Sequence, residues 1–320
     1  MLIYNKGEMA ALAVEYGFQR DTFEKVLRLK KVLEFFQKDR LLKEHLILKG
    51  GTAINLTVFV LPRLSVDIDM DYVPNDARED MLAQREKISE TIKGYMEDEG
   101  YQLAGNSRFS HSLDAFHYRY QNSGGTQDIM KIEINYSLRA HILEPKFQPI
   151  LTNAFDGTME LLTVHPIEIF AAKANALLNR AAARDLYDFN NLVTMNLFAE
   201  EQSLFRKAVV FYATISAETV NRHFDLSAID GLTFAKIRRD LFPVLTRTEA
   251  REHFDLTQYQ LRVKSYLEDL MRLTPEEGEY IDRFIQGEYK PALLFDDDLI
   301  VSRIINHPMA IWKCASNRKR

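Results

Sequence analysis

The sequence predicts an α+β fold: a small mixed or antiparallel sheet flanked by helices over residues 1–158, followed by an all-helical part over residues 159–320. Two observations predict this division. Short apolar runs between residues 46 and 138 are separated by turns rich in glycine, asparagine and serine, which is typical of strands. From about residue 160 onward almost every segment has apolar residues at helical spacing. We place the boundary at residue 158, beside the turn Phe155-Asp156-Gly157.

The composition is that of an ordinary globular protein. The 320 residues are 46% hydrophobic and 27% charged, and the formal net charge of −5 means that a nucleic-acid partner would have to meet a local basic patch. No apolar run approaches the ~18 residues of a membrane helix, and Lys6 and Glu8 stand where a signal peptide has its apolar core. The single cysteine, Cys314, excludes an internal disulfide and fits a reducing compartment. We therefore expect a cytoplasmic protein without a membrane partner.

Two helices are predicted before the first strand, over residues 8–18 and 21–43. Asp21 is the expected N-cap of the second helix. The polar face of the second helix carries a run of basic residues, namely Lys25, Arg28, Lys30, Lys31 and Lys38. This face is either a solvated surface, which the interspersed acidic residues favour, or an RNA contact.

A glycine pair follows the short strand predicted over residues 46–48. Gly50-Gly51-Thr52 is the expected tight turn, and residues 53–60 are the expected start of a helix whose free N–H groups suit an anion. Neither the Walker nor the Rossmann pattern of glycines is present. The glycine pair alone is therefore weak evidence for a phosphate site.

Residues 66–72 alternate between apolar and acidic side chains, which predicts a strand with Asp67, Asp69 and Asp71 on one face. Asp67 and Asp69 are then about 6.6 Å apart at Cα, close enough for both carboxylates to reach one divalent cation, whereas Asp71 is too far from Asp67. Like charges on one face raise each other's pKa unless a cation or an arginine neutralises them. The pattern therefore predicts a metal site.

Two other interpretations apply to this aspartate strand. It could be a charged, solvated strand that resists edge pairing. It could also be a calcium-binding EF-hand loop, but Tyr72 stands where that loop needs glycine and Arg78 where it needs a bidentate glutamate. The first interpretation stays open, and the residues exclude the second.

After the aspartate strand we expect a turn at Pro74-Asn75-Asp76, a helix over residues 79–99 that covers the sheet, and strands over 101–103, 115–120 and 129–138. On the last strand Glu133 lies on the polar face with Lys131 and Asn135. An acid on such a face is commonly structural.

Residues 167–195, which follow His165-Pro166, are alanine-rich, free of glycine and predicted to be helical. On a continuous helix Arg180 and Arg184 would each fall within about 20° of Lys173, and the three would form one cationic rail suited to a triphosphate. The alternative is a solvent face of a surface helix. Further helices are expected over residues 201–222, 229–245, 257–272 and 275–287, the last opened by a capping box at Thr274.

Basic residues recur in the helical part, at Lys236, Arg238, Arg239, Arg247, Arg251, Arg318, Lys319 and Arg320. If the protein acts on RNA, the RNA backbone would lie along these residues, because phosphate contacts come chiefly from lysine and arginine. Scattered surface charge is the alternative interpretation.

The motifs resemble those of a known family. Gly50-Gly51-Thr52 followed by Asp67-x-Asp69 resembles the GG[ST]…DxD signature of the polymerase-β-like nucleotidyltransferases. The longer pattern LKGGTAINL…RLSVDIDMD is similar to the AbiEii/AbiGii toxin family, which includes the MenT-like toxins. The run K-x6-R-x3-RDLYD, which begins at Lys173, resembles the second conserved block of that family, and the HP…WK ending resembles its C-terminal block.

This resemblance implies a catalytic domain over residues 1–158 and a helical domain that contributes a nucleotide-binding lysine. The implied ligands of Mg²⁺ or Mn²⁺ are Asp67, Asp69 and Glu133. The implied nucleotide-binding residues are Gly50, Gly51, Thr52, Ser65, Lys173, Arg180 and Arg184. The implied catalytic residues are Asp67, Asp69, Lys173, Asp185 and Glu133, with Glu133 or Asp185 as the base and Asp188 supporting Lys173.

The resemblance also implies a function. The protein would be a metal-dependent nucleotidyltransferase that serves as the toxin of a toxin–antitoxin or phage-defence pair, with a cognate antitoxin as partner. It would transfer a nucleotide from a nucleoside triphosphate, CTP or GTP foremost, to RNA such as a tRNA 3′ end. The alternatives are nucleotidylation of a small molecule or protein, and a nucleotide-binding regulator without catalysis.

Overall fold

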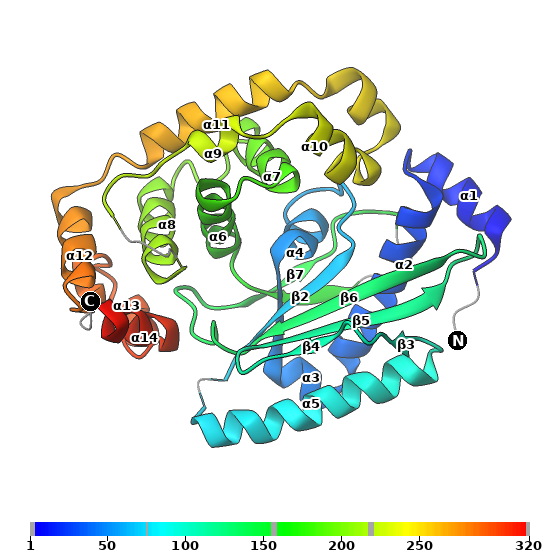
Figure 1. Cartoon of the computed structure of the whole chain (residues 1–320), viewed down its shortest axis with the longest axis horizontal. Helices are drawn as coiled ribbons and strands as arrows, with labels where there is room; N and C mark the ends of the chain where they lie inside the picture. Colours follow the sequence, from blue (N-terminus) through cyan, green and yellow to red (C-terminus); the bar gives the residue numbers. More distant parts are fainter. Residues whose placement is uncertain (1–3, 75, 155–158, 217–220, 318–320) are drawn as a thin grey trace. The chain divides into compact units, whose positions relative to one another are not determined.

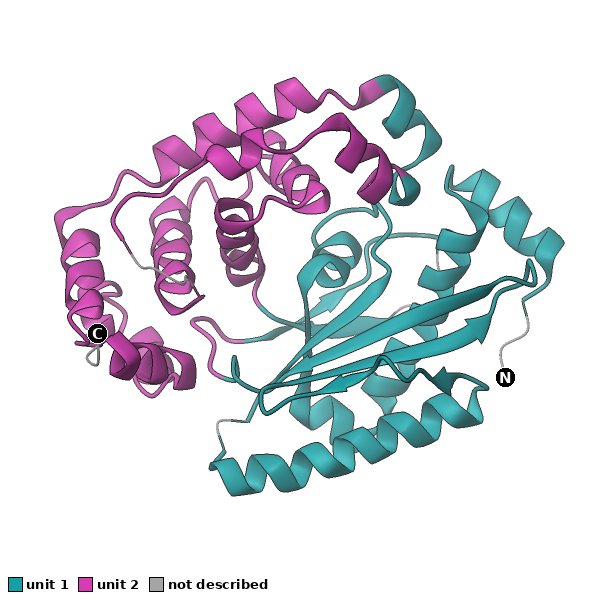
Figure 2. Ribbon diagram, in the orientation of Figure 1, with its two compact units in different colours: residues 1–139, 145–164, 243–252 teal, residues 140–144, 165–242, 253–320 magenta. Residues whose placement is uncertain are grey.

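The computed structural model describes residues 4–74, 76–154, 159–216 and 221–317. The chain divides into two compact units (Figure 2). Unit 1 comprises Met1–Arg139, Pro145–Val164 and Pro243–Glu252, and unit 2 comprises Ala140–Glu144, His165–Phe242 and His253–Arg320.

Unit 1 is built on one mixed sheet (Figure 1). Its strands are β1 (Leu46–Lys49), β2 (Asp67–Tyr72), β3 (Gln102–Leu103), β4 (Arg108–Phe109), β5 (Leu113–Gln121), β6 (Gln127–Asn135), β7 (Lys146–Pro149) and β8 (Glu160–Thr163). Its helices are α1 (Lys6–Glu15), α2 (Arg20–Lys38), α3 (Arg40–His45), α4 (Gly50–Thr57) and α5 (Arg78–Asp98). The strand order is β3-β5-β6-β2-β1-β8-β7, with β4 also paired to β5. The α+β class and the mixed sheet are confirmed.

The aspartate strand β2 lies in the middle of this sheet. It pairs antiparallel with β1, where Lys49 is opposite Asp69, and parallel with β6, where Asp69 is opposite Glu133. A central strand has no open edge, so its acidic residues cannot serve as protection against edge pairing. The interpretation of residues 66–72 as a charged edge strand is therefore wrong.

One face of the sheet is apolar and is covered by helices. Ile68, Met70, Ile132 and Ile134 are all buried on this face. Tyr95 of α5 stacks on Phe35 of α2 with ring centroids 3.8 Å apart, and Arg85 of α5 makes an ion pair with Asp114 of β5. The opposite face therefore holds the polar side chains of β2 and β6, as the alternating pattern predicts.

The basic residues of α2 do not form an open surface. The Arg28 guanidinium lies over the rings of Tyr4 and Tyr120, and Arg28 and Lys30 are buried. Arg28 pairs with Glu24, and Lys25 pairs with Asp128. Most of the basic residues that we considered for an RNA contact are therefore buried or paired within the chain.

The first unit extends beyond residue 158 because β8 pairs with both β1 and β7. The division falls at Val164/His165. The turn at Phe155-Asp156-Gly157, where we placed it, lies outside the described residues, as does Asn75 of another predicted turn.

A later segment, Pro243–Glu252, also belongs to unit 1. Leu245 forms a β-bridge with Arg63, and the Leu64 N–H donates to the Val244 carbonyl oxygen at 2.8 Å. The Arg247 N–H donates to the Gly17 carbonyl oxygen at 2.9 Å. These backbone bonds connect the segment to the chain just before β2 and to the end of α1.

Unit 2 is helical, as predicted. Its helices are α6 (Pro166–Asn179), α7 (Ala183–Thr194), α8 (Gln202–Ser216), α9 (Ser227–Asp230), α10 (Phe234–Asp240), α11 (Leu256–Leu270), α12 (Pro275–Ile285), α13 (Asp298–Ile304) and α14 (Pro308–Asn317). The short helix η3 (Pro291–Leu293) also belongs to unit 2, whereas η1 (Phe242–Val244) and η2 (Glu249–His253) lie mostly in the segment Pro243–Glu252 of unit 1. The rings of Phe170, Phe189 and Phe205 connect α6, α7 and α8 in the core. The capping box at Thr274 is confirmed.

The segment Ala140–Glu144 belongs to unit 2 because of one buried carboxylate. Glu168 of α6 accepts hydrogen bonds from the Ile142 and Leu143 N–H groups at 2.9 and 2.8 Å and from the Tyr212 hydroxyl at 2.6 Å. These hydrogen bonds, with His141 nearby, hold the pKa of Glu168 below its ordinary value despite the opposing effect of burial. Glu168 therefore ties this connecting segment to α6 and α8.

Several predicted helix boundaries are wrong. Asp21 is not an N-cap, because Gln19 occupies that position and Asp21 pairs with Arg20 instead. Residues 21–43 form two helices, since Asp39 ends α2 and its carboxylate accepts from the Leu42 N–H to begin α3. The range 229–245 is likewise divided among α9, α10 and η1.

In the part of the chain that is described, no helix combines the length and the apolar character needed to span a membrane.

Candidate active site

The site in unit 1 is built where the start of α4 meets the polar face of β2. Gly50 has φ +71°, a left-handed backbone conformation that disfavours a side chain. A Cβ atom at this position would lie 2.7 Å from Oδ2 of Asp69. Gly50 is thus required both by its backbone conformation and by the close approach of an acidic side chain.

Gly51 has neighbours of its own. A Cβ atom at residue 51 would lie 2.7 Å from Nη2 of Arg63 and 3.0 Å from Oγ of Ser65. Arg63 is 2% exposed, and its Nη1 donates to the Leu64 carbonyl oxygen at 2.9 Å. The chain that enters β2 therefore places a guanidinium and a hydroxyl against the first turn of α4. We did not predict Arg63 as a site residue.

Thr52 connects the same turn to the aspartate strand. Its hydroxyl donates to the Asp67 carbonyl oxygen at 2.5 Å, and the residue is 1% exposed. The expected tight turn is the beginning of α4 itself, which starts at Gly50 rather than at residue 53. The Thr52 hydroxyl thus fixes α4 to β2.

The two predicted metal carboxylates lie on the polar face of β2, and the pKa of Asp69 is perturbed. Burial raises the pKa of Asp69 to about 6; Lys49 opposes the rise, and the carboxylates of Asp67 and Glu133 add to it. Both desolvation and like charge therefore disfavour the ionised form of Asp69.

Asp71 does not share this environment. It is 3% exposed, and its carboxylate makes an ion pair with the Lys49 ammonium. The Lys49 ammonium thus occupies the carboxylate that we expected to stay outside the metal pair. Lys49 was missed as a site residue because its position opposite β2 depends on strand pairing.

Glu133 lies opposite Asp69 on β6, on the predicted face. Its Oε2 is 2.9 Å from Nζ of Lys131, so it already has a cationic partner. Within the described ranges no group of three His, Cys, Asp or Glu side chains is arranged to hold a metal ion. Asp69 and Glu133 thus lie on adjacent strands. The predicted cluster of three ligands is not formed among the described residues.

The donor set nevertheless fits a divalent cation at Asp67 and Asp69. Carboxylate oxygens are the ligands that Mg²⁺ and Mn²⁺ prefer, and Mg²⁺ is commonly bound by one or two carboxylates together with phosphate oxygens. Burial and the neighbouring carboxylates together raise the pKa of Asp69 more than Lys49 and Lys131 lower it. A bound cation would supply the missing compensation.

Unit 2 contains the second predicted cluster. Lys173 of α6 is 8% exposed, and its Nζ lies 2.8 Å from Oδ1 of Asp185 and 2.8 Å from Oδ2 of Asp188, both on α7. The i, i+3 spacing places both carboxylates on one face of α7. The structure thus brings Lys173, Asp185 and Asp188 together, as the sequence resemblance implies.

The predicted rail of Lys173, Arg180 and Arg184 is not formed as a single helix face. Helix α6 ends at Asn179, where Arg180 is the C-cap and Ala181 has φ +41°. The N–H groups of Arg180 and Ala181 both donate to the Ala176 carbonyl oxygen, which closes the helix end. The assumption of a continuous helix is therefore wrong.

The two arginines have different surroundings. Arg180 is exposed, whereas Nε of Arg184 donates to the Asp240 carbonyl oxygen at 2.9 Å. Arg184 thus connects the start of α7 to the end of α10. The structure gives it a role in packing that the spacing did not predict.

The basic residues considered for RNA are distributed over both units. Lys236, Arg238 and Arg239 lie on α10 in unit 2, and Arg239 is paired with Asp240. Arg247 and Arg251 belong to the segment Pro243–Glu252 of unit 1. Arg318, Lys319 and Arg320 lie outside the described residues.

Comparisons with known proteins agree with this architecture. The family model described as the nucleotidyl transferase AbiEii toxin of type IV toxin–antitoxin systems matches residues 35–287, a range that contains both clusters. Among solved structures, the chain is similar to MenT4, a nucleotidyltransferase toxin from Mycobacterium tuberculosis, with a TM-score of 0.62, 17% identity, and coverage of 96% of this chain and 99% of that chain. This likeness shows a shared fold, and no curated protein sequence matches the chain. The chain belongs to the AbiEii family of nucleotidyltransferase toxins.

Proposed function

We propose that the protein transfers a nucleoside monophosphate from a nucleoside triphosphate to an RNA acceptor, in a reaction that requires a divalent metal. CTP and GTP are the proposed donors, and a tRNA 3′ end is the proposed acceptor. A cognate antitoxin is the proposed partner, since the family consists of toxins from type IV toxin–antitoxin systems. Nucleotidyltransferase activity follows from family membership, and the rest is the proposal.

The observation that carries the proposal is the position of Asp69. Its carboxylate is so close to Gly50 that a Cβ atom there would lie 2.7 Å from Oδ2, and its pKa is raised to about 6, chiefly by burial. An acidic side chain held at the first turn of a helix places a cation ligand beside backbone N–H groups that suit phosphate. Both features are needed to bind a metal-bound triphosphate.

Asp67 and Asp69 are the proposed metal ligands, and Glu133 is a third candidate on the adjacent strand. A bound Mg²⁺ or Mn²⁺ would neutralise phosphate charge and stabilise charge that develops during phosphoryl transfer. The backbone of Gly50 and Gly51, with the Ser65 hydroxyl, would bind phosphate oxygens. Thr52 would meet phosphate through its backbone, because its hydroxyl donates to the Asp67 carbonyl oxygen.

Lys173 is the proposed phosphate-binding cation of unit 2. Asp185 and Asp188 each lie 2.8 Å from its ammonium, which fixes the side chain. Arg180, which is exposed at the end of α6, is a further candidate for phosphate binding. Arg184 is another candidate, and its Nε donates to the Asp240 carbonyl oxygen. The general base that accepts the proton of the attacking hydroxyl would be Glu133 or Asp185.

The experiment that tests this function uses each of the four nucleoside triphosphates labelled with ³²P at the α-phosphate. The protein is incubated with one triphosphate and total RNA, with and without Mg²⁺, and the products are separated on a denaturing gel. We expect label in a defined RNA band with one triphosphate, and no label without Mg²⁺ or with the Asp69→Asn variant. Asp98→Asn, an exposed substitution on α5, is the matched control and should leave labelling unchanged.

Other outcomes would change the proposed acceptor or the proposed metal site. Label in a protein band or in a small molecule would replace RNA by that acceptor. Label in RNA that persists without a divalent metal, or with Asp69→Asn, would overturn the assigned metal site. The comparison of Glu133→Gln with Asp185→Asn identifies the base, because its loss should lower kcat with little effect on the KM for the triphosphate.

A further inference from the structure

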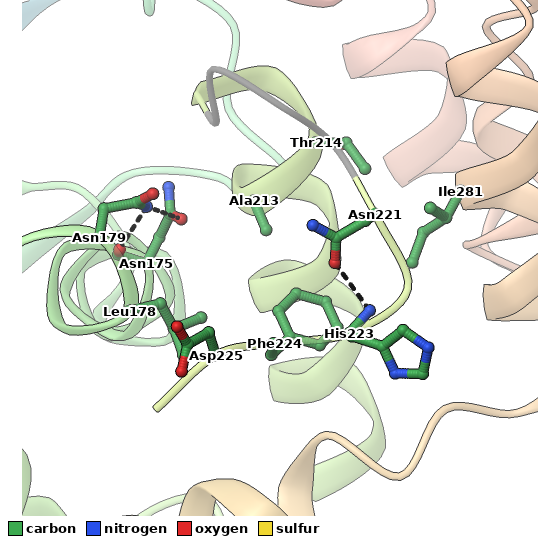
Figure 3. Close-up of a pocket in the computed structure, with 10 residues that line it drawn as sticks. All are labelled: Asn175, Leu178, Asn179, Ala213, Thr214, Asn221, His223, Phe224, Asp225 and Ile281. Carbon is green, nitrogen blue, oxygen red and sulfur yellow. Dashed lines mark hydrogen bonds between the residues drawn. The ribbon is translucent and has the colours of Figure 1, made fainter. Parts of the chain in front are cut away.

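Unit 2 contains a cavity that the site above does not use. It lies between α6, α8, α12 and the chain that precedes α9 (Figure 3). Its volume is about 130 Å³. A cavity of roughly 150 Å³ in another protein holds one benzene molecule. The size therefore suits one six-membered ring and is too small for a whole nucleotide.

One wall of the cavity presents a fixed hydrogen-bond acceptor. Asn175 is 7% exposed, and its amide nitrogen donates to the Tyr212 carbonyl oxygen and to Ser216. Asn179 in turn donates from Nδ2 to the Asn175 carbonyl oxygen at 2.7 Å and to its Oδ1 at 2.8 Å. Because both amide protons of Asn179 are committed, its Oδ1 is the atom available to a ligand.

Another wall presents a donor. The Asn221 side chain accepts from the His223 N–H through Oδ1 at 2.8 Å, which leaves its NH₂ group as the donor. In Figure 3 this nitrogen points to the side on which Ala213 of α8 is drawn. An acceptor and a donor on different walls match a ring that carries both kinds of group on its edges.

The remaining walls suit a ring without charge. Leu178, Phe224 and Ile281 supply apolar surface, and Phe224 offers an aromatic ring. The lining, as far as the chain is described, includes no lysine or arginine but does include Asp225. Hydrogen bonds from the Ser227 N–H and hydroxyl lower the pKa of Asp225, so it stays ionised and disfavours phosphate. Bases in single-stranded RNA are commonly bound by aromatic stacking and by hydrogen bonds to their edges.

We propose that this cavity binds one uncharged pyrimidine ring, with its sugar and phosphate left outside. The site is built from unit 2 alone, and the inference goes beyond the proposed function without depending on it. The ring could come from a free pyrimidine nucleoside or from an unpaired pyrimidine in single-stranded RNA. Both sources share the same edge chemistry.

The test measures binding of cytidine, uridine and adenosine to the full-length protein by calorimetry, without a divalent metal. Nucleosides carry no phosphate, so the metal and phosphate contacts of the site of Asp67 and Asp69 do not contribute to their binding. We expect cytidine or uridine to bind and adenosine to bind at least tenfold more weakly. Asn179→Ala and Asn221→Ala should each weaken pyrimidine binding about three- to tenfold, the effect of one hydrogen bond.

Three further variants control for misfolding and separate the cavity from the nucleotide-transfer site. Leu178→Trp fills the cavity and should abolish binding, whereas Asn306→Ala, an exposed substitution elsewhere in unit 2, should not change it. Asp69→Asn should lose transfer and keep cytidine binding. A hexauridylate RNA and its abasic counterpart then separate the two sources, because only the oligonucleotide with bases should compete with cytidine if the source is RNA. Absence of saturable pyrimidine binding, equal binding of adenosine, or unchanged binding in Leu178→Trp would overturn the proposal.

Discussion

The guanidinium of Arg63 lies only 2.7 Å from the point where the side chain of residue 51 would begin. A neighbouring side chain is therefore sufficient to explain why residue 51 is glycine. The same holds for Gly50, whose missing Cβ leaves room for Asp69. The glycine pair thus accommodates protein groups, while its backbone remains available for phosphate.

Gly51→Ala should destabilise the protein by about 1–3 kcal/mol, because the buried Arg63 must shift to admit a methyl group. The additional cost should fall below about 0.5 kcal/mol in an Arg63→Ala background, where that space is already open. The measurement is a double-mutant cycle of unfolding free energies in urea.

Gly94→Ala is the matched control for Gly51→Ala. Gly94 lies on an exposed face of α5, and a Cβ atom there would meet nothing within 4 Å, so alanine should be neutral or stabilising. An equal cost of Gly51→Ala in both backgrounds would mean that the backbone, and not Arg63, requires the glycine.

Asp69→Asn should abolish transfer and stabilise the metal-free protein at neutral pH. The pKa of Asp69 in the folded protein is about 6 and its ordinary value is 3.8, so the folded state binds the extra proton between these pH values. The wild-type protein therefore loses stability as the pH rises from 3.8 to about 6, and asparagine does not. The advantage of Asp69→Asn should be absent below pH 3.8 and reach about 1–2 kcal/mol above pH 6, since the residue keeps some exposure to solvent.

Mg²⁺ provides the check on this result. Urea unfolding at pH 8 with added Mg²⁺ should show stabilisation of the wild-type protein and none of Asp69→Asn. A variant that is less stable than the wild type at pH 8, or that remains active, would contradict the assignment.

Lys173→Ala should lose both triphosphate binding and turnover, and Lys173→Arg should recover only part of them. The substitution to alanine leaves Asp185 and Asp188 without the cation that holds them at 2.8 Å, which should cost about 3–5 kcal/mol of stability. The double variant Lys173→Ala, Asp188→Asn removes the excess charge and should regain stability without activity. Melting temperature and steady-state kinetics separate the two effects.

The control for Lys173 is Lys264→Ala, which breaks a surface ion pair with Asp230 and should cost less than about 1 kcal/mol. If the double variant regains stability and activity together, Lys173 has a purely structural role.

RNA binding should weaken steeply with salt, because each phosphate neutralised by a basic residue releases a counterion. Arg238 is exposed on α10, and Arg238→Gln should weaken binding to all RNA sequences alike and reduce the salt slope by about one. Filter binding between 50 and 200 mM KCl measures this. An affinity that does not change over this range would point to a small-molecule acceptor.

Local patterns predicted the faces of the strands but not their partners. Alternation alone placed Asp67 and Asp69 on the polar side of β2, because side-chain direction in a strand depends only on position. The ion pair between Lys49 and Asp71 depends on the antiparallel register of β1 and β2, which no local pattern determines. For the same reason Arg63 was not predicted as a neighbour of Gly51.

The end of α6 shows a second limit of prediction from local sequence. Residues 180–183 contain neither glycine nor proline, and alanine favours helices, so propensity predicted continuity. The backbone instead turns at Ala181, which adopts a left-handed conformation. This break begins α7 separately, and α7 presents Asp185 and Asp188 to Lys173. Tertiary packing here overrides a local preference.

The segment Pro243–Glu252 also has a consequence for synthesis. Residues 63–64 and Gly17 emerge from the ribosome long before the chain that bonds to them, since translation adds about 5–20 residues per second. Unit 1 thus lacks backbone partners for about ten seconds or more after its first strands have been made. A nascent chain that stops at Val164 would hold every proposed catalytic residue of unit 1 but neither this segment nor Lys173. If Lys173 binds phosphate as proposed, only the nearly finished chain has full activity.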